Sequence, residues 1–165
     1  KRFNTLGCSI EWKNSPIPFK QLAALHWTTM IYEAARALCW LSEYPEALIG
    51  ARLREVLAEG SEVTTENYVS ARSEINNLRR QFFDAIDQSN VFYWPATPGP
   101  APKGIGSTGE PKYIAPWTTL GGPIITLTSN QTSNDLPLGC LLSGQPGSDR
   151  TTGSFARVLC PFSAS

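Results

Sequence analysis

Few residues in this 165-residue chain have types and spacings that could carry out catalysis. His26 is the only histidine, and it could serve as a general base for a serine or cysteine nucleophile in a small hydrolase. No nucleophile motif accompanies it, and neither Cys8 nor Cys140 lies in one, so a packing or capping histidine is favoured. The carboxylates are scattered along the expected helices without an evident acid–base pair. The sequence therefore predicts no catalytic residue.

The cysteines and glycines argue against metal and nucleotide sites. The four cysteines form no Cys-x-x-Cys pair, and with a single histidine they do not make a zinc site of the usual kind. The glycines between residues 99 and 109 fit neither nucleotide-binding signature. We therefore expect no metal and no cofactor. Disulfides are possible, but buried free thiols in a reducing compartment are favoured, which predicts a cytoplasmic protein.

The charge balance excludes one large class of function. The chain has 14 basic and 14 acidic residues and a formal net charge of zero, whereas an electrostatic nucleic-acid binder needs a basic excess or a basic face. Arg79-Arg80 is the only adjacent basic pair in the body of the chain, and a solvated helix face explains it. No apolar run is long enough to span a bilayer. We expect neither nucleic-acid nor membrane partners.

The first half of the chain has helical periodicity. After a short alternating segment at 8–12 that predicts a strand, apolar residues recur at three- and four-residue steps. This pattern predicts helices at about 19–44, 46–58 and 64–87. Gly60 is expected to close the second helix, and Thr64 is expected to cap the third.

From residue 91 the composition changes to short apolar runs among Pro, Gly, Ser and Thr. Four prolines lie within the eight residues 95–102, and Pro95 must end the strand before it. Strands are predicted at about 91–94, 123–128 and 138–143, with a helical turn at 113–120. The expected fold is α/β, a partial mixed sheet with helices packed on it, and residues 1–165 form a single domain or a fragment. Its 1–90 part is mainly helical, and its 91–165 part is strand and loop.

Several short segments, taken in order, resemble the carboxyl-terminal part of the amidase signature family of amide hydrolases. They are Leu6-Gly7-Cys8, Glu33-Ala34-Ala35, Glu59-Gly60, Tyr68-Val69-Ser70-Ala71-Arg72, Pro95-Ala96-Thr97-Pro98 with Ala101-Pro102, Ser107-Thr108-Gly109, Pro116-Trp117-Thr118, Gly121-Gly122-Pro123 and Leu136-Pro137-Leu138-Gly139. The resemblance covers residues 6–150. No single segment is decisive, but their order is specific.

The resemblance implies hydrolysis of an amide C–N bond in the parent enzyme, without metal or organic cofactor. In that family a serine attacks, a second serine relays the proton to an unprotonated lysine, and backbone donors form the oxyanion hole. This chain has no Ser-Ser dipeptide, and its only Gly-Gly, Gly121-Gly122, precedes proline. None of its five lysines lies in a setting like that of the catalytic lysine. No catalytic residue is carried over, and this chain alone is expected to be inert.

The resemblance also implies that this part of the chain borders the acyl-binding pocket. The expected pocket-wall residues are Thr97, Pro98, Ile114, Trp117, Leu120, Trp27 and Met30. A core role is the main interpretation of Trp27 and Met30, and anchoring of a loop is the alternative for Trp117. The expected partners are a small amide or ester substrate in the parent enzyme and a missing amino-terminal half, or a second copy.

The sequence departs from the family near its end. Leu141 stands where the family usually has glutamine, and Arg150 to Ser165 lacks the apolar helix with which the family closes. The sequence of residues 150–165 therefore does not predict the closing helix of the family. A non-catalytic binding or interaction module on a remnant hydrolase scaffold is the alternative function. Such a chain would expose a sheet edge and an apolar face, and would associate with itself or a partner.

Overall fold

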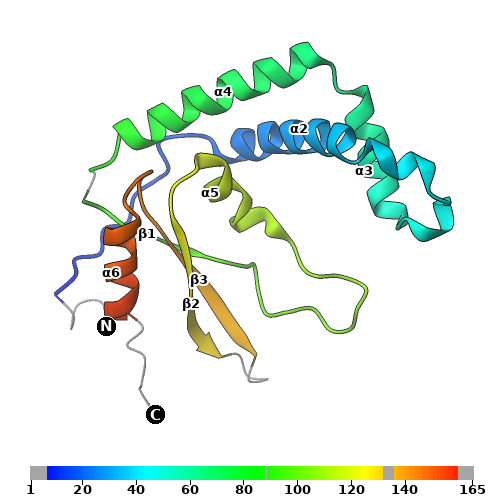
Figure 1. Cartoon of the computed structure of the whole chain (residues 1–165). Coiled ribbons are helices and arrows are strands. Elements are labelled where there is room, and N and C mark those ends of the chain that lie inside the picture. The colour runs from blue at the N-terminus through cyan, green and yellow to red at the C-terminus, as the bar shows by residue number, and fades with distance from the viewer. Residues whose placement is uncertain (1–6, 88, 132–135, 160–165) are drawn as a thin grey trace. The chain divides into compact units, whose positions relative to one another are not determined.

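The computed structural model describes residues 7–87, 89–131 and 136–159 and divides the chain into two compact units (Figure 1). One unit comprises Ile17–Gln81. The other comprises Lys1–Pro16 together with Phe82–Ser165. We call them the helical unit and the sheet unit and describe each by itself.

The helical unit consists of three helices with a short irregular connection. Helix α2 spans Phe19–Ala37, the 3₁₀ turns η1 and η2 span Cys39–Glu43 and Glu46–Leu48, and α3 spans Ala51–Glu62. Helix α4 begins at Thr65 and ends at Asp84, so its last residues belong to the sheet unit. The three predicted helices are therefore present. The first two differ at their ends, because 3₁₀ turns occupy residues 39–48.

The prediction that Gly60 closes the second helix is wrong. Gly60 lies inside α3, where a Cβ atom would overlap the backbone carbonyl of Ile31 on α2. The glycine therefore permits a close approach of two helix backbones, which is its other common role. It is buried, as this contact requires.

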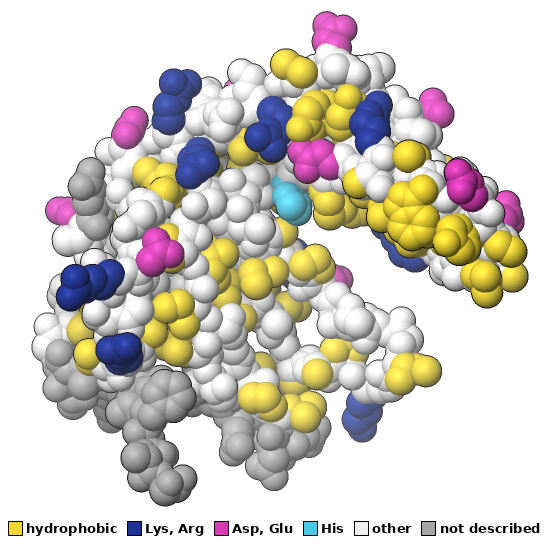
Figure 2. Space-filling view, in the orientation of Figure 1, with side chains coloured by type: hydrophobic (Ala, Val, Ile, Leu, Met, Phe, Trp, Pro, Cys, Tyr) yellow, Lys and Arg dark blue, Asp and Glu magenta, His cyan; other side chains and the backbone are white. Residues whose placement is uncertain are grey.

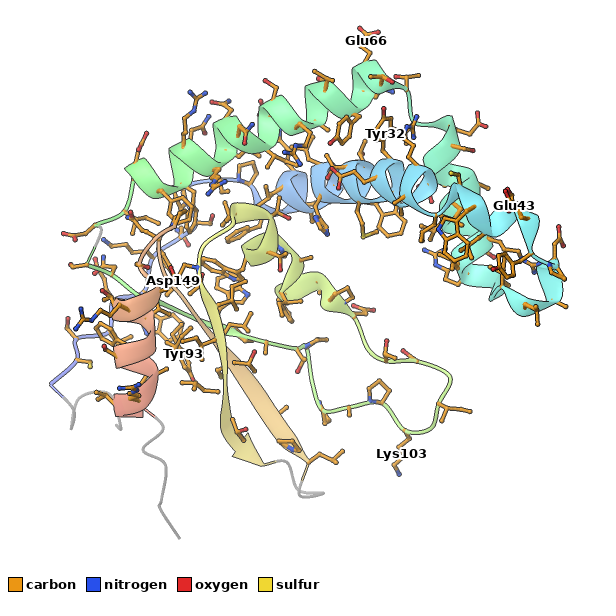
Figure 3. All side chains as sticks on the ribbon, viewed as in Figure 1. Tyr32, Glu43, Glu66, Tyr93, Lys103 and Asp149 are labelled. Atoms are coloured by element: carbon orange, nitrogen blue, oxygen red, sulfur yellow. The ribbon has the colours of Figure 1, made fainter. Side chains whose placement is uncertain are left out.

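The predicted cap of the third helix is confirmed. The Thr64 hydroxyl accepts a hydrogen bond of 3.1 Å from the backbone N–H of Asn67, which satisfies one of the unpaired donors of the first turn. Glu66 lies in that turn, where its carboxylate interacts favourably with the helix dipole (Figure 3). The buried apolar positions of α4 repeat at helical spacing. They are Ala71, Ile75, Leu78 and Phe82.

The sheet unit contains a three-stranded sheet with the order β1-β3-β2. Strand β1 spans Phe92–Pro95, β2 spans Ile124–Gln131 and β3 spans Pro137–Ser143. Both pairings are antiparallel, with Trp94 opposite Leu141 and Ile125 opposite Leu142. The three predicted strands are thus confirmed within one to three residues at their ends.

Between β1 and β2 the chain forms two short helical elements, and after β3 it forms one more helix. The 3₁₀ turn η3 spans Pro111–Tyr113, α5 spans Ala115–Leu120 and α6 spans Asp149–Leu159. Gly121 ends α5 with a φ of 73°, a left-handed conformation that favours glycine, and its N–H donates to Trp117 O. The predicted helical turn at 113–120 is therefore present.

Each face of the sheet is covered by a different helix. Leu142 packs with Ala156 and Leu159 of α6, and the half-buried Val91, Ile125 and Leu127 pack against this cluster (Figure 1). Leu141 is the next residue along β3 and therefore points to the opposite face. Phe92 and Trp94 share that opposite face, and both of their rings contact Trp117 of α5. Central strand β3 is buried on both faces, which explains the continuous burial from Leu141 to Ser143.

The fold-class prediction, α/β with helices packed on a partial sheet, is confirmed. Parallel pairing, as a mixed sheet would include, is not found among the described strands. The short strand predicted at 8–12 is wrong, because the structure has no regular secondary structure at these residues. Conversely, the helix that the sequence pattern did not support is present as α6. Its buried residues Thr152, Ala156 and Leu159 recur at helical spacing on an otherwise polar helix, so α6 is amphipathic and not the apolar helix that the family pattern led us to look for.

Candidate functional site

The candidate site begins with α5, the short helix that carries three predicted pocket-wall residues. Trp117 is 2% exposed, and its ring centroid lies 5.2 Å from that of Phe92, 5.6 Å from that of Phe82 and 5.9 Å from that of Trp94. Leu120 is completely buried. Both residues anchor α5 to the sheet unit, which is the alternative role that the sequence left open for Trp117.

Ile114 lies at the start of the same helix. It is half-buried, and its carbonyl accepts the N–H of Thr118, the first bond of α5. Pro116 follows in the first turn, where a missing N–H costs nothing and the fixed φ favours a helix. Ile114 is thus held by the buried helix but retains exposed surface.

Thr97 and Pro98 begin the proline-rich loop, and both are exposed. The backbone N–H of Ala96 donates to Gly139 O at 3.0 Å, which extends the β1–β3 pairing just past Pro95. The Thr97 hydroxyl donates to Gly99 O at 2.7 Å. The loop therefore leaves the sheet in a defined direction, and Lys103 lies further along it (Figure 3).

Trp27 and Met30 belong to the helical unit. The indole N–H of Trp27 donates to Glu59 Oε1 at 2.8 Å, and the guanidinium of Arg52 lies 5.7 Å from the ring centroid. Trp27 therefore connects α2 to α3, but it is only half-buried, so the predicted core role of this residue is wrong. Met30 is 37% exposed, so a core role for this side chain is wrong.

The structure brings together only part of the predicted wall. Ile114, Trp117 and Leu120 share one helix, and Thr97 and Pro98 share one loop of the same unit. Trp27 and Met30 lie on α2 of the other unit. A single wall that includes all seven residues stays a prediction.

His26 lies on α2 and is half-buried. Burial lowers the pKa of its imidazole, and the nearby charge of Glu33 opposes that shift. A neutral imidazole suits a general base, but such a base also needs a nucleophile within hydrogen-bond reach. In the part of the chain that the structure describes, no hydroxyl or thiol bonds to this imidazole.

Metal-binding and membrane-spanning features are not found in residues 7–87, 89–131 and 136–159. In these ranges no three His, Cys, Asp or Glu residues gather closely enough to hold a metal ion. No helix in the same ranges is both long and apolar enough to cross a bilayer. Cys39 and Cys140 are free thiols, and Cys160 lies outside the described residues. On the face in Figure 2, acidic and basic side chains are interspersed.

Sequence reasoning missed the polar contacts that fix the chain between β3 and α6. Gln145 Nε2 donates to Ile86 O at 3.1 Å, which ties this loop to the end of α4. Ser148 Oγ donates to Gln145 O and lies 3.3 Å from Thr152 Oγ1. A Cβ on Gly144 would overlap both of these hydroxyls. The sequence indicated none of these partners.

Comparison with known proteins identifies the relatives of this arrangement. No protein-family model matches the sequence. Human fatty-acid amide hydrolase 2 is 26% identical over 149 residues, which cover 87% of this chain but 27% of that protein. A crystal structure of an amidase aligns with 95% of this chain and 38% of its own length, with a TM-score of 0.82 and 24% identity.

A bacterial aryl acylamidase of the amidase signature family aligns with 96% of this chain and 37% of its own, with a TM-score of 0.69 and 16% identity. This chain therefore spans about a quarter to two fifths of the length of the relatives it matches. These two structural likenesses concern the fold, whereas the human relative is also similar in sequence. The predicted resemblance is confirmed: this chain is similar in sequence to part of an amide hydrolase and in fold to part of an amidase signature enzyme.

Proposed function

We propose that this chain is the carboxyl-terminal portion of an amidase-family hydrolase that cleaves amide C–N bonds. It contributes helices, sheet strands and part of the substrate-pocket wall, whereas other polypeptide supplies the two serines and the lysine. The observation that carries this proposal is the 149-residue match to about a quarter of human fatty-acid amide hydrolase 2. The ordered segments of the sequence support the carboxyl-terminal assignment.

The lysines of this chain support the absence of the catalytic machinery. The family mechanism needs an unprotonated lysine, whereas the hydrogen bond from Lys112 to Glu110 raises the pKa of that ammonium group. The two side chains form an ion pair of 3.0 Å. Lys13 is similarly paired with Glu11 at 3.1 Å. Lys112 is therefore a poor acceptor for a serine proton.

The described geometry divides the predicted wall into supporting and contacting residues. Trp117 and Leu120 are too buried to touch a substrate, so they hold α5 in place. Ile114, Thr97 and Pro98 retain exposed surface and are the residues of the sheet unit that can contact the acyl group. Met30 offers exposed surface on α2, whereas the indole of Trp27 is bonded to Glu59 of α3.

The proposal includes a substrate class and a location. The human relative is named for fatty-acid amides and a bacterial one for aryl acylamides, so a small amide or ester is the common substrate chemistry. No metal or organic cofactor takes part. The protein is cytoplasmic and binds neither nucleic acid nor membrane.

The test compares the isolated chain with a chimera. The chain alone and the chain fused to the amino-terminal segment of an amidase signature enzyme are assayed with an aryl amide and an aryl ester. We expect turnover only by the chimera, and we expect it to disappear when the nucleophilic serine of the added segment becomes alanine. Turnover by the isolated chain would contradict the proposal.

A matched pair of variants tests the pocket wall within the chimera. Ile114→Ala should raise KM for the longer acyl amides, because it removes apolar contact surface. Lys103→Ala, further along the loop, should leave kcat and KM unchanged. A folded chimera without turnover would favour the alternative, a non-catalytic binding or interaction module.

A further inference from the structure

One face of helix α2 packs on α3 within the helical unit. The indole N–H of Trp27 donates to Glu59 Oε1 at 2.8 Å. Two turns later, the Cβ atom of Ala35 lies 3.0 Å from the position that a Cβ would take at Gly60. Residues about two turns apart lie on the same side of a helix, so these contacts define the α3 face of α2.

A second face of α2 packs on α4. The ring of Tyr32 stacks on that of Tyr68, with their centroids 4.2 Å apart (Figure 3). The Tyr68 hydroxyl donates to Glu33 Oε1 at 2.7 Å, and Gln21 Nε2 donates to Glu74 Oε1 at 3.3 Å. Two of the faces of α2 are therefore occupied by the other helices of its unit.

His26 and Met30 share a third face of α2. They are four residues apart, which places them on one side of the helix. Counted at about 100° per residue, this side lies between Glu33, at the margin of the α4 face, and Trp27, on the α3 face. His26 is half-buried, and Met30 is exposed. Among the described residues, the imidazole of His26 has no hydrogen-bond partner.

The chemistry of this third face suits an uncharged ligand with one polar atom. Ala23 lies one turn before His26 and Met30 one turn after it, so apolar groups flank the imidazole. Burial lowers the pKa of His26, so at neutral pH the ring is uncharged and offers one N–H donor. The charge of Glu33 acts on the same imidazole and would repel an anionic group bound there.

We propose that His26 determines substrate specificity in the pocket wall: beside Met30, its imidazole N–H donates a hydrogen bond to an oxygen atom in the acyl part of the substrate. This inference rests on the proposed function, in which Met30 belongs to that wall. It names the substrate class, amides with an uncharged acyl group that carries an ether, hydroxyl or carbonyl oxygen. Such a bond also gives a partner to a polar side chain that is half-buried without one. His26 takes no part in bond cleavage.

The test uses the chimera, which contains the full 165-residue chain, and matched pairs of nitroanilides. One member of each pair has an unbranched alkanoyl group, and in the other an ether oxygen replaces one methylene, at a different position in each pair. For the best position, kcat/KM should be about fivefold higher for the ether than for its all-carbon partner. His26→Leu should abolish this preference. His26→Gln keeps an N–H donor and should retain most of it.

Thr28→Val is the matched control on the same helix. Thr28 lies about 200° around α2 from His26, and its hydroxyl donates to Ala24 O within the helix, so its loss should leave the preference unchanged. A histidine that only supports the fold would lower kcat/KM for both members of a pair equally when it is replaced.

The outcomes separate this inference from the proposed function. Turnover without a preference for any ether, or with the same preference in wild type and His26→Leu, would overturn the inference and leave the proposed function standing. A folded chimera without turnover would overturn both.

Discussion

The helical unit and the sheet unit hold their elements together by different means. In the helical unit, polar side chains link the helices at their surface: Trp27 donates to Glu59 at 2.8 Å, and Tyr68 donates to Glu33 at 2.7 Å. In the sheet unit, three aromatic rings from two separate parts of the chain, the end of α4 and strand β1, surround Trp117. The first arrangement is distributed over many exposed contacts, whereas the second is concentrated on one buried side chain.

This difference predicts which substitutions should destabilise each unit most. An exposed hydrogen bond or ion pair contributes little net free energy, because water competes for both partners. A buried aromatic side chain contributes several kcal/mol, because its removal leaves a cavity. The helical unit should therefore tolerate loss of any single surface contact, whereas its buried side chains, such as Leu22 and Leu78, and the close backbone approach at Gly60 should be sensitive to substitution.

The largest effect should follow from Trp117→Ala in the sheet unit. Loss of a large buried aromatic side chain costs about 3–5 kcal/mol in the free energy of unfolding, which is a large share of the stability of an average domain. Urea denaturation followed by circular dichroism and by hydrogen exchange of β3 measures this loss. Trp12→Ala removes the same side chain from a 94% exposed position and should change stability by less than about 0.5 kcal/mol. Equal losses in the two variants would contradict a core organised around Trp117.

A smaller effect should follow from Gly60→Ala in the helical unit. The added Cβ would overlap the Ile31 carbonyl, so α2 and α3 must move apart, at a cost of about 1–3 kcal/mol. Hydrogen exchange of amides in α2 and α3 measures the change.

Gly153→Ala in α6 is the matched control for this substitution. No atom lies within 4 Å of a Cβ built at Gly153, so alanine should stabilise this helix by about 0.5–1 kcal/mol through its better helix propensity. The same substitution in the two units should thus have opposite signs. A stabilising Gly60→Ala would show that the helices do not need their close approach.

Removal of the hydroxyl that caps α4 should lower the free energy of unfolding by less than Gly60→Ala does. Thr64→Ala removes the acceptor for the Asn67 N–H and should lower the free energy of unfolding by about 1 kcal/mol. Thr64→Ser keeps a hydroxyl at this position and should restore most of the stability. Amide exchange in the first turn of α4 separates the two variants. If serine were as harmful as alanine, the hydroxyl would not be the stabilising group.

Local signals in the sequence were sufficient where a few neighbouring residues determine the structure. Thr64 marked the start of α4, and Pro95 marked the end of β1, because caps and prolines act on their own backbone. The helix at about 64–87 was also predicted from its apolar periodicity, and Ala71 and Phe82 are buried at that spacing in α4. The order of family-like segments predicted the fold that the comparisons then confirmed.

The sequence was insufficient to predict structure where contacts with residues far away in the chain determine it. Gly60 packs against α2, about thirty residues earlier, and nothing near it in the sequence indicates that contact. The segment 8–12 has a strand pattern, but a strand forms only when an edge is available to it. At the candidate site, the residue types at 117 and 120 predicted apolar contact. They did not show that these side chains are buried supports, because burial depends on β1 and α4.

The smallest predicted effect is the change in the free energy of unfolding with pH that titration of His26 causes. Burial lowers the pKa of this imidazole below its ordinary value of 6.5, so in the unfolded chain it binds a proton at a higher pH than in the folded one. Between the two pKa values the unfolded state holds more protons. Stability from the neutral imidazole is therefore complete above 6.5 and is lost as the pH falls below it.

The variant His26→Gln isolates this contribution, because it removes the titrating group and keeps a polar side chain of similar size. Urea denaturation from about pH 5 to about pH 8 should show that the stability difference, wild type minus variant, rises with pH and levels off. The carboxylates titrate in both proteins and cancel in the difference. Amide exchange in α2 should follow the same pH dependence, whereas exchange in β3 of the sheet unit should not. A difference that falls with rising pH would mean that the charge of Glu33, which opposes the effect of burial, determines the pKa of His26 instead.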